Sequence, residues 1–426
     1  MNRTLILACF NINMENLLSF DEYYNEEDKI YHFWLKFKKN TAGCPHCGSV
    51  SIWSKGFYDV TLNASVIRGV TCIAHVKTRR YVCNDCKKTF KEKNSFYEDY
   101  STISNPVKLS ILRDLKEKFT YSDIAKMYDV SVNFVIDTFD RIPRISRTIL
   151  PAVMCIDEFH FSNDVNHNPR YPVVISNPYN NDIVDIIEYR TKLVLSNYFE
   201  KIPLYERKMV KYFVSDMNQT FKQIKRIYFT NAVHIIDHFH IIKGFNDAIQ
   251  NERRELLRKY KHDKENKNYI FLKNNRNIFL MRLYKLQKMI KIGAKGYSYD
   301  LIFTLEEAFR NYPEIGEIYY AREEFADTMV KMMSYEETEK YYDYFINKIS
   351  NSLSKSLQNL AKTLIRWKKE IISGYAKNDT GFYLSNAVAE ANNNVIQTYI
   401  NISYGLTDFE RFRNRILYIN MHRKRG

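Results

Sequence analysis

The chain of 426 residues has no long hydrophobic run, only 12 Gly and only 9 Pro. Its first apolar segment, Leu5 to Phe10, is too short to span a membrane, and no small-residue cleavage site follows it. We therefore expect neither a membrane anchor nor an export signal. The length excludes a single hydrophobic core and favours two to four domains. Apolar residues make up 45% of the chain and aromatic residues 15%, which is typical of a globular protein.

Acidic side chains are outnumbered, because 49 Asp and Glu stand against 64 Lys and Arg, and the formal net charge is +15. Such a surplus favours a polyanion as partner. A lysine-rich proteome with low-GC coding would also give a positive net charge, and the abundance of Lys, Asn, Ile and Tyr fits that alternative. The surplus is concentrated in residues 251–292, with 13 basic against 4 acidic side chains, and in 411–426, with six basic and none acidic. We expect these two segments to line a nucleic-acid groove.

The chain has an odd number of cysteines, seven, and four of them form two Cys-x-x-Cys pairs, which favours an intracellular metal site over a disulfide framework. Cys44 and Cys47 precede a β-rich stretch, and Cys83 and Cys86 follow it. Two such turns, which we call knuckles, offer four thiolates for one tetrahedral zinc ion and predict a structural zinc ribbon over residues 39–95. A redox pair would need only one knuckle. The other cysteines are expected to be core residues.

Residues 100–148 have the pattern of a helix-turn-helix. Ala125 is the small residue where two helices would cross, and Ser131 would cap the second helix. On that helix we expect Val132 to face the core, and Asn133 and Thr138 to be exposed. The helix is poor in Arg and Lys, so specific base reading has little support, and a purely structural helical hairpin is the alternative.

From residue 149 the pattern changes to strands. Three hairpin-linked strands, a helix and two further strands are the order of a ribonuclease-H-like fold. In that order Asp157 lies on the first strand and Asp216 at the end of the fourth, where neighbouring carboxylates can share a metal ion. The predicted elements are strands over 153–161, 171–176 and 183–189, a helix over 191–199, and strands over 209–215 and 233–237.

The expected fold class is therefore multidomain α+β, with a ribonuclease-H-like catalytic domain interrupted by an all-helical insertion. Glu390 lies on a predicted helix beyond that insertion. The expected domains are an N-terminal arm (1–38), the zinc ribbon (39–95), the helix-turn-helix (100–148), the first part of the catalytic domain (149–245), the helical insertion (246–379) and the second part of the catalytic domain with a basic tail (380–426).

The chain resembles the ISL-three family of bacterial insertion-sequence transposases almost from end to end. Each matching block is short, and the specificity lies in their order behind the zinc ribbon and the helix-turn-helix. The blocks are Cys44-Pro-His-Cys47-Gly-Ser, Arg79-Arg80-Tyr-Val-Cys83 to Thr89-Phe90, Ile156-Asp157-Glu158-Phe159, Asp216-Met217, Asn231-Ala232, Asp237-His-Phe239-His240, Trp367 with Ile371, Ser385-Asn386 to Glu390 and Asn393, and Tyr404-Gly405 with Phe409 and Arg415.

The resemblance implies an acid-triad (DDE-type) transposase that binds terminal inverted repeats and cuts and joins DNA. Asp157, Asp216 and Glu390 would be the catalytic acids and would hold two Mg²⁺ or Mn²⁺ ions. It also implies target DNA as a second substrate, a homodimer or larger assembly, and a bacterial cytoplasmic, nucleoid-associated location. DNA contacts are expected from Arg79, Arg80, Ser131, Asn133, Arg253, Arg254 and Arg415.

Several alternatives stay open from the sequence. Asp237 is either a fourth metal ligand or a group that orients the site, and His240 and Asn393 are further candidates beside the acids. Around Glu390 the chain departs from the family, because residues such as Ala391 and Gln397 stand where glycine and basic residues are common. A diverged transposase fits this departure, and so does a repurposed DNA-binding protein without catalysis. A metal-dependent nuclease unrelated to transposition would share the acids.

Overall fold

The computed structural model describes residues 7–8, 10, 12–67, 69–161, 171–291, 295–331, 334–375, 387–402 and 408–422. The chain divides into two compact units. The first comprises residues 1–146 together with 398–426, and the second comprises residues 147–397. The sequence analysis predicted that all of residues 380–426 belong to the catalytic domain. In the structure the last helix packs with the first unit.

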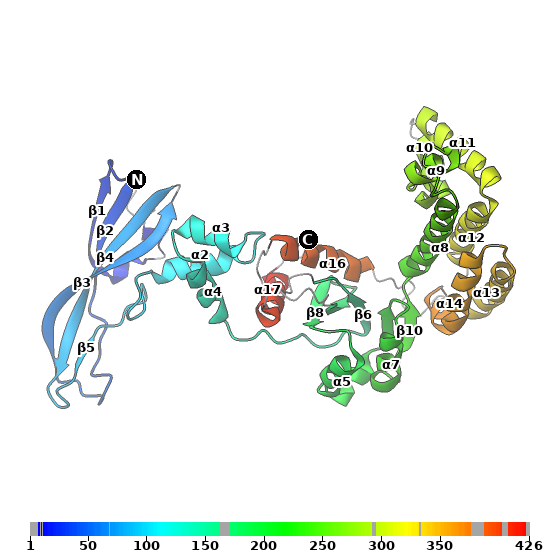
Figure 1. The fold of residues 1–426 in the computed structure, drawn as a ribbon. Helices are drawn as coiled ribbons and strands as arrows, with labels where there is room; N and C mark the ends of the chain where they lie inside the picture. The colour runs from blue at the N-terminus through cyan, green and yellow to red at the C-terminus, as the bar shows by residue number, and fades with distance from the viewer. Residues whose placement is uncertain are drawn as a thin grey trace. The chain divides into compact units, whose positions relative to one another are not determined.

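A five-stranded sheet forms the beginning of the first unit, in the order β1-β2-β4-β3, with β5 also paired to β4 (Figure 1). Phe33 and Leu35 of β2 alternate with the partly exposed residues His32, Trp34 and Lys36, and they pack against Leu62 of β3 in one core. The segment expected as a separate arm therefore belongs to the same sheet as the cysteine-bearing strand β4. The elements are η1 Met14–Asn16, β1 Leu17–Asn25, β2 Ile30–Phe37, β3 Ile52–Ile67, β4 Val70–Cys83 and β5 Thr89–Lys91.

Three short helices follow, α2 Asn105–Asp114, α3 Tyr121–Tyr128 and α4 Val132–Asp140. The Ser131 hydroxyl accepts a hydrogen bond from the Phe134 N–H, so its predicted capping role is confirmed. Asp129, in a left-handed conformation (φ 50°), makes the turn between α3 and α4. Two side-chain predictions were wrong. Val132 is exposed, whereas Thr138 is buried and donates to the Phe134 carbonyl, which turns it toward its own helix.

The last helix, α17 (Phe409–His422), packs on these three helices. The Tyr418 ring lies edge-on to Phe139, and its hydroxyl donates to the Leu112 carbonyl. Arg411 pairs with Asp140 of α4 at 2.7 Å. The helix-turn-helix therefore has a fourth helix, supplied by residues more than 260 positions further along the chain.

A second five-stranded sheet lies in the second unit, in the order β10-β9-β6-β7-β8. β6, β7 and β8 are antiparallel, whereas β9 and β10 run parallel to β6. Met154 and Ile156 of β6 pack on one face against Phe199 of α5 and Phe221 of α7. The elements are β6 Val153–Glu158, β7 Val173–Asn177, β8 Asp182–Ile187, α5 Lys192–Glu200, α6 Leu204–Met209, β9 Tyr212–Ser215, α7 Gln219–Tyr228 and β10 Val233–Ile236.

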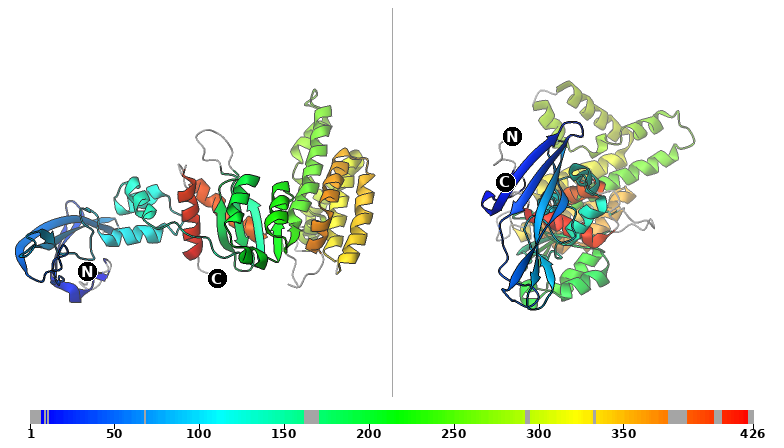
Figure 2. Two further views of the ribbon diagram at one scale, coloured as in Figure 1. Left: turned by 90° about the horizontal axis from the view of Figure 1, so that it is seen from below. Right: turned by 90° about the vertical axis from the view of Figure 1, so that its left-hand side faces the viewer.

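From β10 to residue 402, all the elements that the structure describes are helices (Figures 1 and 2). α8, α12, α13 and α14 lie side by side around a core that includes Phe245, Phe325 and Phe345. α15 returns to the sheet, where Gly374 lies so close to Ile235 of β10 that a Cβ would stand 3.1 Å from it. The helices are α8 His238–Lys259, α9 Lys267–Asn274, η2 Ile278–Leu280, α10 Leu283–Lys291, α11 Lys295–Asn311, α12 Pro313–Met329, α13 Tyr335–Ser350, α14 Lys355–Arg366, α15 Lys368–Tyr375 and α16 Ala387–Ile402.

An ion pair between the partly buried Arg147 and the buried Glu206 fixes the start of the second unit. Arg147 donates to both carboxylate oxygens of Glu206 on α6, at 2.5 and 2.9 Å, and the Leu150 N–H donates to the same carboxylate at 2.7 Å. Arg147 above all, and then the Leu150 N–H, hold the pKa of Glu206 below its ordinary value of 4.5. The charged carboxylate therefore stabilises the folded unit above that value, and the contribution is lost as the pH falls through the lower, folded-state pKa.

We expect Glu206→Gln to lower the free energy of unfolding at pH 7 by about 1–3 kcal/mol. The variant should also lose less stability than the parent on acidification below pH 4.5, because it lacks the group that titrates there. Denaturant unfolding at neutral pH and at an acidic pH where both proteins still fold measures both effects. If the free energies of unfolding of variant and parent differ by the same amount at both pH values, Glu206 does not contribute to the pH dependence of stability.

Candidate functional site

The two Cys-x-x-Cys turns have the same backbone structure. In each, the first cysteine's carbonyl accepts from the N–H four residues later, so Gly48 bonds to Cys44 and Lys87 to Cys83. The first cysteine's own N–H donates to the carbonyl five residues later. Gly48 (φ 76°) and Lys87 (φ 59°) adopt the left-handed conformation that closes each turn.

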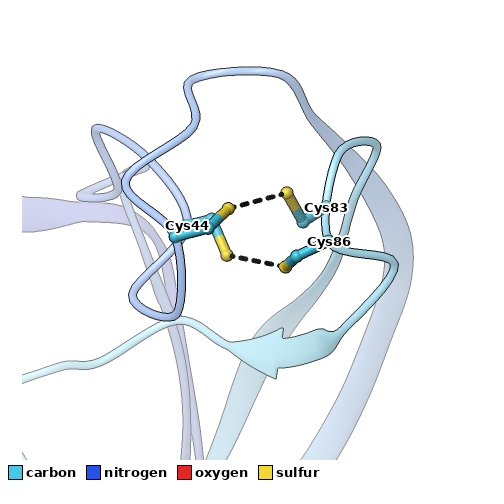
Figure 3. Close-up of side chains that lie close together, drawn as sticks. Cys44, Cys83 and Cys86 are labelled. Atoms are coloured by element: carbon cyan, nitrogen blue, oxygen red, sulfur yellow. Dashed lines mark hydrogen bonds between the residues drawn. The ribbon is translucent and has the colours of Figure 1, made fainter.

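The four sulfur atoms converge from these turns (Figure 3). Cys44 and Cys86 are 3.6 Å apart, Cys47 and Cys83 are also 3.6 Å apart, and all four sulfurs lie within 4.8 Å of one another. A zinc tetrahedron with Zn–S bonds of about 2.3 Å has edges of about 3.8 Å, so the thiols fit zinc. Backbone N–H groups, first that of Cys86, lower the pKa of Cys83 to about 6, which favours the thiolate that binds metal. The cluster is the zinc-binding site predicted from the sequence.

Three aspartates lie at the ends of three neighbouring parallel strands: Asp157 is the next-to-last residue of β6, Asp216 directly follows β9, and Asp237 directly follows β10. The register pairs Cys155 of β6 with Val214 of β9, and continuing it by two residues aligns Asp157 with Asp216. The β9–β10 register pairs Ser215 with Ile236, so the next position aligns Asp216 with Asp237. Because register partners in parallel strands point to one face, the three carboxylates share the face opposite α5 and α7.

Burial makes these carboxylates unusual. Asp157 is 5% and Asp237 1% exposed. Burial raises the pKa of Asp216, although His240 and then Arg190 oppose that rise. The Oδ1 atom of Asp216 is buried and has no hydrogen-bond partner among the described residues. An unsatisfied buried oxygen on a carboxylate of this kind suits a divalent cation, which would supply the missing contact.

His238 and His240 lie in the first turn of the long helix α8, beside the strand ends that carry the acids. The Asp237 carbonyl accepts from the His240 N–H, and the His240 ring nitrogen Nε2 lies 4.0 Å from the Asp237 carboxylate. Burial lowers the pKa of His240. Among the described residues the four cysteines are the one group of three or more potential ligands whose atoms all lie within 4.8 Å. The strand-end acids are therefore more widely spaced than a closed metal cage.

Helix α16 carries Glu390 and contacts the face on which the acids lie. Asn392 donates to the hydroxyl of Ser176 at 3.2 Å, and Ser176 pairs with Cys155 in the β6–β7 register. Asn392 follows Glu390 by two residues, or about 3 Å of helix rise. The backbone of Glu390 is helical, but the side chains of Glu390 and Asn393 lie outside the described residues.

Family comparison covers most of the chain. The family described as Transposase, of the ISL3 type, matches residues 132–416, and the zinc-finger of transposase IS204/IS1001/IS1096/IS1165 matches residues 40–86. The chain belongs to the ISL3 family of insertion-sequence transposases. The alternative of a repurposed, non-catalytic protein is not favoured by this match. No curated protein matches the transposase significantly. No described helix of the transposase is long and apolar enough to cross a membrane.

The predicted DNA contacts of the transposase divide into two groups. Arg80, Ser131, Asn133 and Arg254 are exposed, and Arg79 is partly exposed with its guanidinium over the Phe57 ring. All five can reach a ligand.

Two predicted contacts are corrected. Arg253 is buried and donates to Gln250 and to the Leu272 carbonyl within the helical region. Arg415 is 1% exposed, lies over the Tyr121 ring and donates to the Phe119 carbonyl. Both arginines hold helices together and have no free surface for DNA. Each lies on the face of its basic segment that packs against neighbouring helices.

Sequence reasoning did not single out Arg190 or Ser176. Arg190 pairs with Glu158, the residue after Asp157, and acts on the pKa of Asp216. Ser176 anchors α16. Only Arg190 had a signal in the sequence: it directly follows the strand predicted over 183–189, and the ends of neighbouring strands lie together at one edge of a sheet.

Proposed function

We propose that the transposase cuts and joins DNA with Asp157, Asp216 and Glu390 as its catalytic acids. The observation that carries this proposal is the strand register, which aligns the buried carboxylate of Asp157 with the partly buried carboxylate of Asp216 at the ends of adjacent parallel strands. The contact between Asn392 and Ser176 supports the third acid, because it anchors the Glu390 helix to the same face.

We also propose that the second unit is a ribonuclease-H-like domain. Three antiparallel strands, a helical crossover and two strands parallel to β6 support this reading. In this view α8–α15 are an insertion between β10 and the helix of the third acid. Its own core, around Phe245 and Phe325, supports an independent subdomain.

The carboxylates of Asp157, Asp216 and Glu390 would hold two Mg²⁺ or Mn²⁺ ions, which would activate the attacking oxygen and stabilise the leaving oxygen of the phosphodiester. Asp157 and Asp216 must both be ionised for this, and burial, which raises the pKa of Asp216, opposes its ionisation. His240 and Arg190 counter that effect at Asp216. Asp237 lies on the far side of Asp216 from Asp157 and orients His240.

For the first unit we propose recognition of the terminal inverted repeats by the zinc ribbon and the helix-turn-helix. Arg80 and Asn133 are exposed on these two modules. Bringing two transposon ends together requires a homodimer or a larger assembly. Because the substrate is chromosomal DNA, the proposed reaction takes place at the bacterial nucleoid.

The test is a reaction of the purified transposase with a labelled duplex that ends in the element's terminal repeat, plus a target plasmid. With Mg²⁺ we expect nicking at the repeat boundary and joining of the labelled 3′ end to the plasmid. Neither product should form in EDTA. Selective binding without nicking would instead support a DNA-binding protein, and nicking without joining would support a nuclease.

A further inference from the structure

The zinc-ribbon sheet has a gap along one edge. β3 occupies the whole of one edge of β4, so β2 and β5 must share the other edge. The β2 pairing ends at Lys77 and the β5 pairing begins at Arg80, which leaves Thr78 and Arg79 between them. Since β2 is parallel and β5 antiparallel to β4, the carboxyl ends of both strands meet in this gap.

A cavity of about 340 Å³ lies at the gap. Its walls come from the residues that leave β2, from β4 itself and from the segment after β5. Four lysines line it, Lys38, Lys39, Lys77 and Lys93, together with asparagine and hydroxyl side chains. Its volume falls at the lower end of the range for ligand sites, roughly 300–1,000 Å³.

The four lysines are exposed, and none of them forms an ion pair with any residue that the structure describes. By contrast, Lys91 pairs with Asp99 and Lys108 pairs with Glu98. Like charges repel, so four lysines around one cavity whose lining holds a single carboxylate, that of Glu92, favour an anion as the ligand.

One carboxylate in the cavity has a structural role. Glu92 accepts from the Asn40 N–H at 2.6 Å, and its own N–H donates to the Arg79 carbonyl. It therefore ties the chain leaving β2 to the chain leaving β5 and fixes the two lysine-bearing segments relative to each other. Lys36 and Arg79 both lie over the Phe57 ring, 4.6 and 5.0 Å from its centroid, which adds two further cationic side chains near the gap.

We propose that this gap, the lysine gap, binds the phosphate backbone of DNA, as a contact separate from the zinc site and the helix-turn-helix. The ligand class follows from the chemistry, because unpaired ammonium groups beside amide and hydroxyl donors recognise phosphodiester oxygens without reading bases. The proposal rests on the DNA-binding role proposed for the first unit. The lysine gap adds affinity and positions the sheet on the duplex, but it adds no sequence preference.

The test compares the full-length transposase with the triple variant Lys38→Gln, Lys77→Gln, Lys93→Gln. Binding to a random-sequence duplex and to a terminal-repeat duplex is measured by fluorescence anisotropy over a salt series. A plot of log affinity against log salt should become shallower by roughly three in the triple variant, on both duplexes alike. Glu92→Gln, which removes the one carboxylate but keeps an acceptor for Asn40, should bind both duplexes several-fold more tightly.

The matched control is Lys29→Gln, at the opposite end of β2, which is exposed and carries the same charge change. Its slope should change by less than one. Zinc content and the unfolding midpoint of each variant verify folding. A triple variant whose slope equals that of Lys29→Gln overturns the proposal. So does a triple variant that loses stabilisation by inorganic phosphate but keeps its DNA affinity, because the gap would then be a free-anion site.

The same measurements distinguish failure of the lysine gap from failure of end recognition by the first unit. If the parent binds random and terminal-repeat duplexes equally, end recognition by the first unit is contradicted, while the lysine comparison on the random duplex still decides the lysine gap. If the parent prefers the terminal repeat and the triple variant shows an unchanged slope, the lysine gap alone is overturned.

Discussion

Asp157→Asn is expected to abolish Mg²⁺-dependent nicking and joining while leaving DNA binding and folding intact. The amide keeps the oxygen that accepts from the Glu158 N–H at 2.9 Å, so the end of β6 should retain its structure. The lost charge, however, removes a ligand of the proposed ions, whose stabilisation of the transition state amounts to several kcal/mol. We therefore expect a loss of about 10³-fold or more in the rate of strand cleavage.

The matched control is Asp185→Asn. Asp185 is also buried in the second sheet, on β8, but it accepts from the Tyr198 hydroxyl and lies away from the strand-end acids. This variant should cleave at nearly the parental rate. Cleavage rates under single-turnover conditions, with thermal unfolding of each protein, make the comparison. An Asp157→Asn protein that cleaves as well as Asp185→Asn would refute the catalytic role of the strand-end acids.

Cys83→Ser is expected to release zinc and to unfold the knuckle end of the first sheet. Cys83 is the last residue of β4 and is fully buried, and its N–H and carbonyl hold the second knuckle. A structural zinc site contributes on the order of 10 kcal/mol in isolated zinc fingers. Here the core around Phe33 and Leu35 lies elsewhere in the sheet, so we expect local rather than global unfolding.

Hydrogen exchange should therefore show lost protection in residues 43–56 and 81–91, with β1 and β2 still protected. Zinc content should fall from one ion per chain to none, and affinity for the terminal-repeat duplex should fall at least tenfold. Cys72→Ala is the control, because Cys72 is a buried cysteine of the same strand that belongs to the hydrophobic core. Full zinc occupancy in Cys83→Ser, or equal zinc loss in Cys72→Ala, would contradict the assignment.

Local sequence patterns predicted the zinc site and the strands of the second sheet. The two Cys-x-x-Cys pairs predicted the zinc site, because their spacing alone dictates a turn that presents two thiolates. Apolar, β-branched runs predicted β6, β7, β8, β9 and β10, with bounds that differ by a few residues from those observed. Asp157 and Asp216 could be nominated because each ends an apolar run. The register that aligns them, and that adds Asp237, depends on which strands pair, and a single sequence does not contain that information.

Features made by residues far apart in the chain could not be predicted. Arg415 is basic and lies in a basic tail, so the sequence pointed to DNA, whereas its guanidinium is buried against Tyr121 of the helix-turn-helix. Arg253 was misjudged for the same reason. The lysine gap depends on two strand ends meeting along β4, and its four lysines are spread over residues 38 to 93. Charge counts identify such residues as basic but do not say which of them converge.

The central claim is that Asp157, Asp216 and Glu390 hold the catalytic ions together. The most direct test is a crystal structure of the transposase on a terminal-repeat duplex with Mn²⁺, located by anomalous scattering. We predict two ions about 3.5–4 Å apart, with oxygens of all three carboxylates as ligands. An ion-free gap between Asp157 and Asp216, or ions bound there with Glu390 remote from both, would contradict the account.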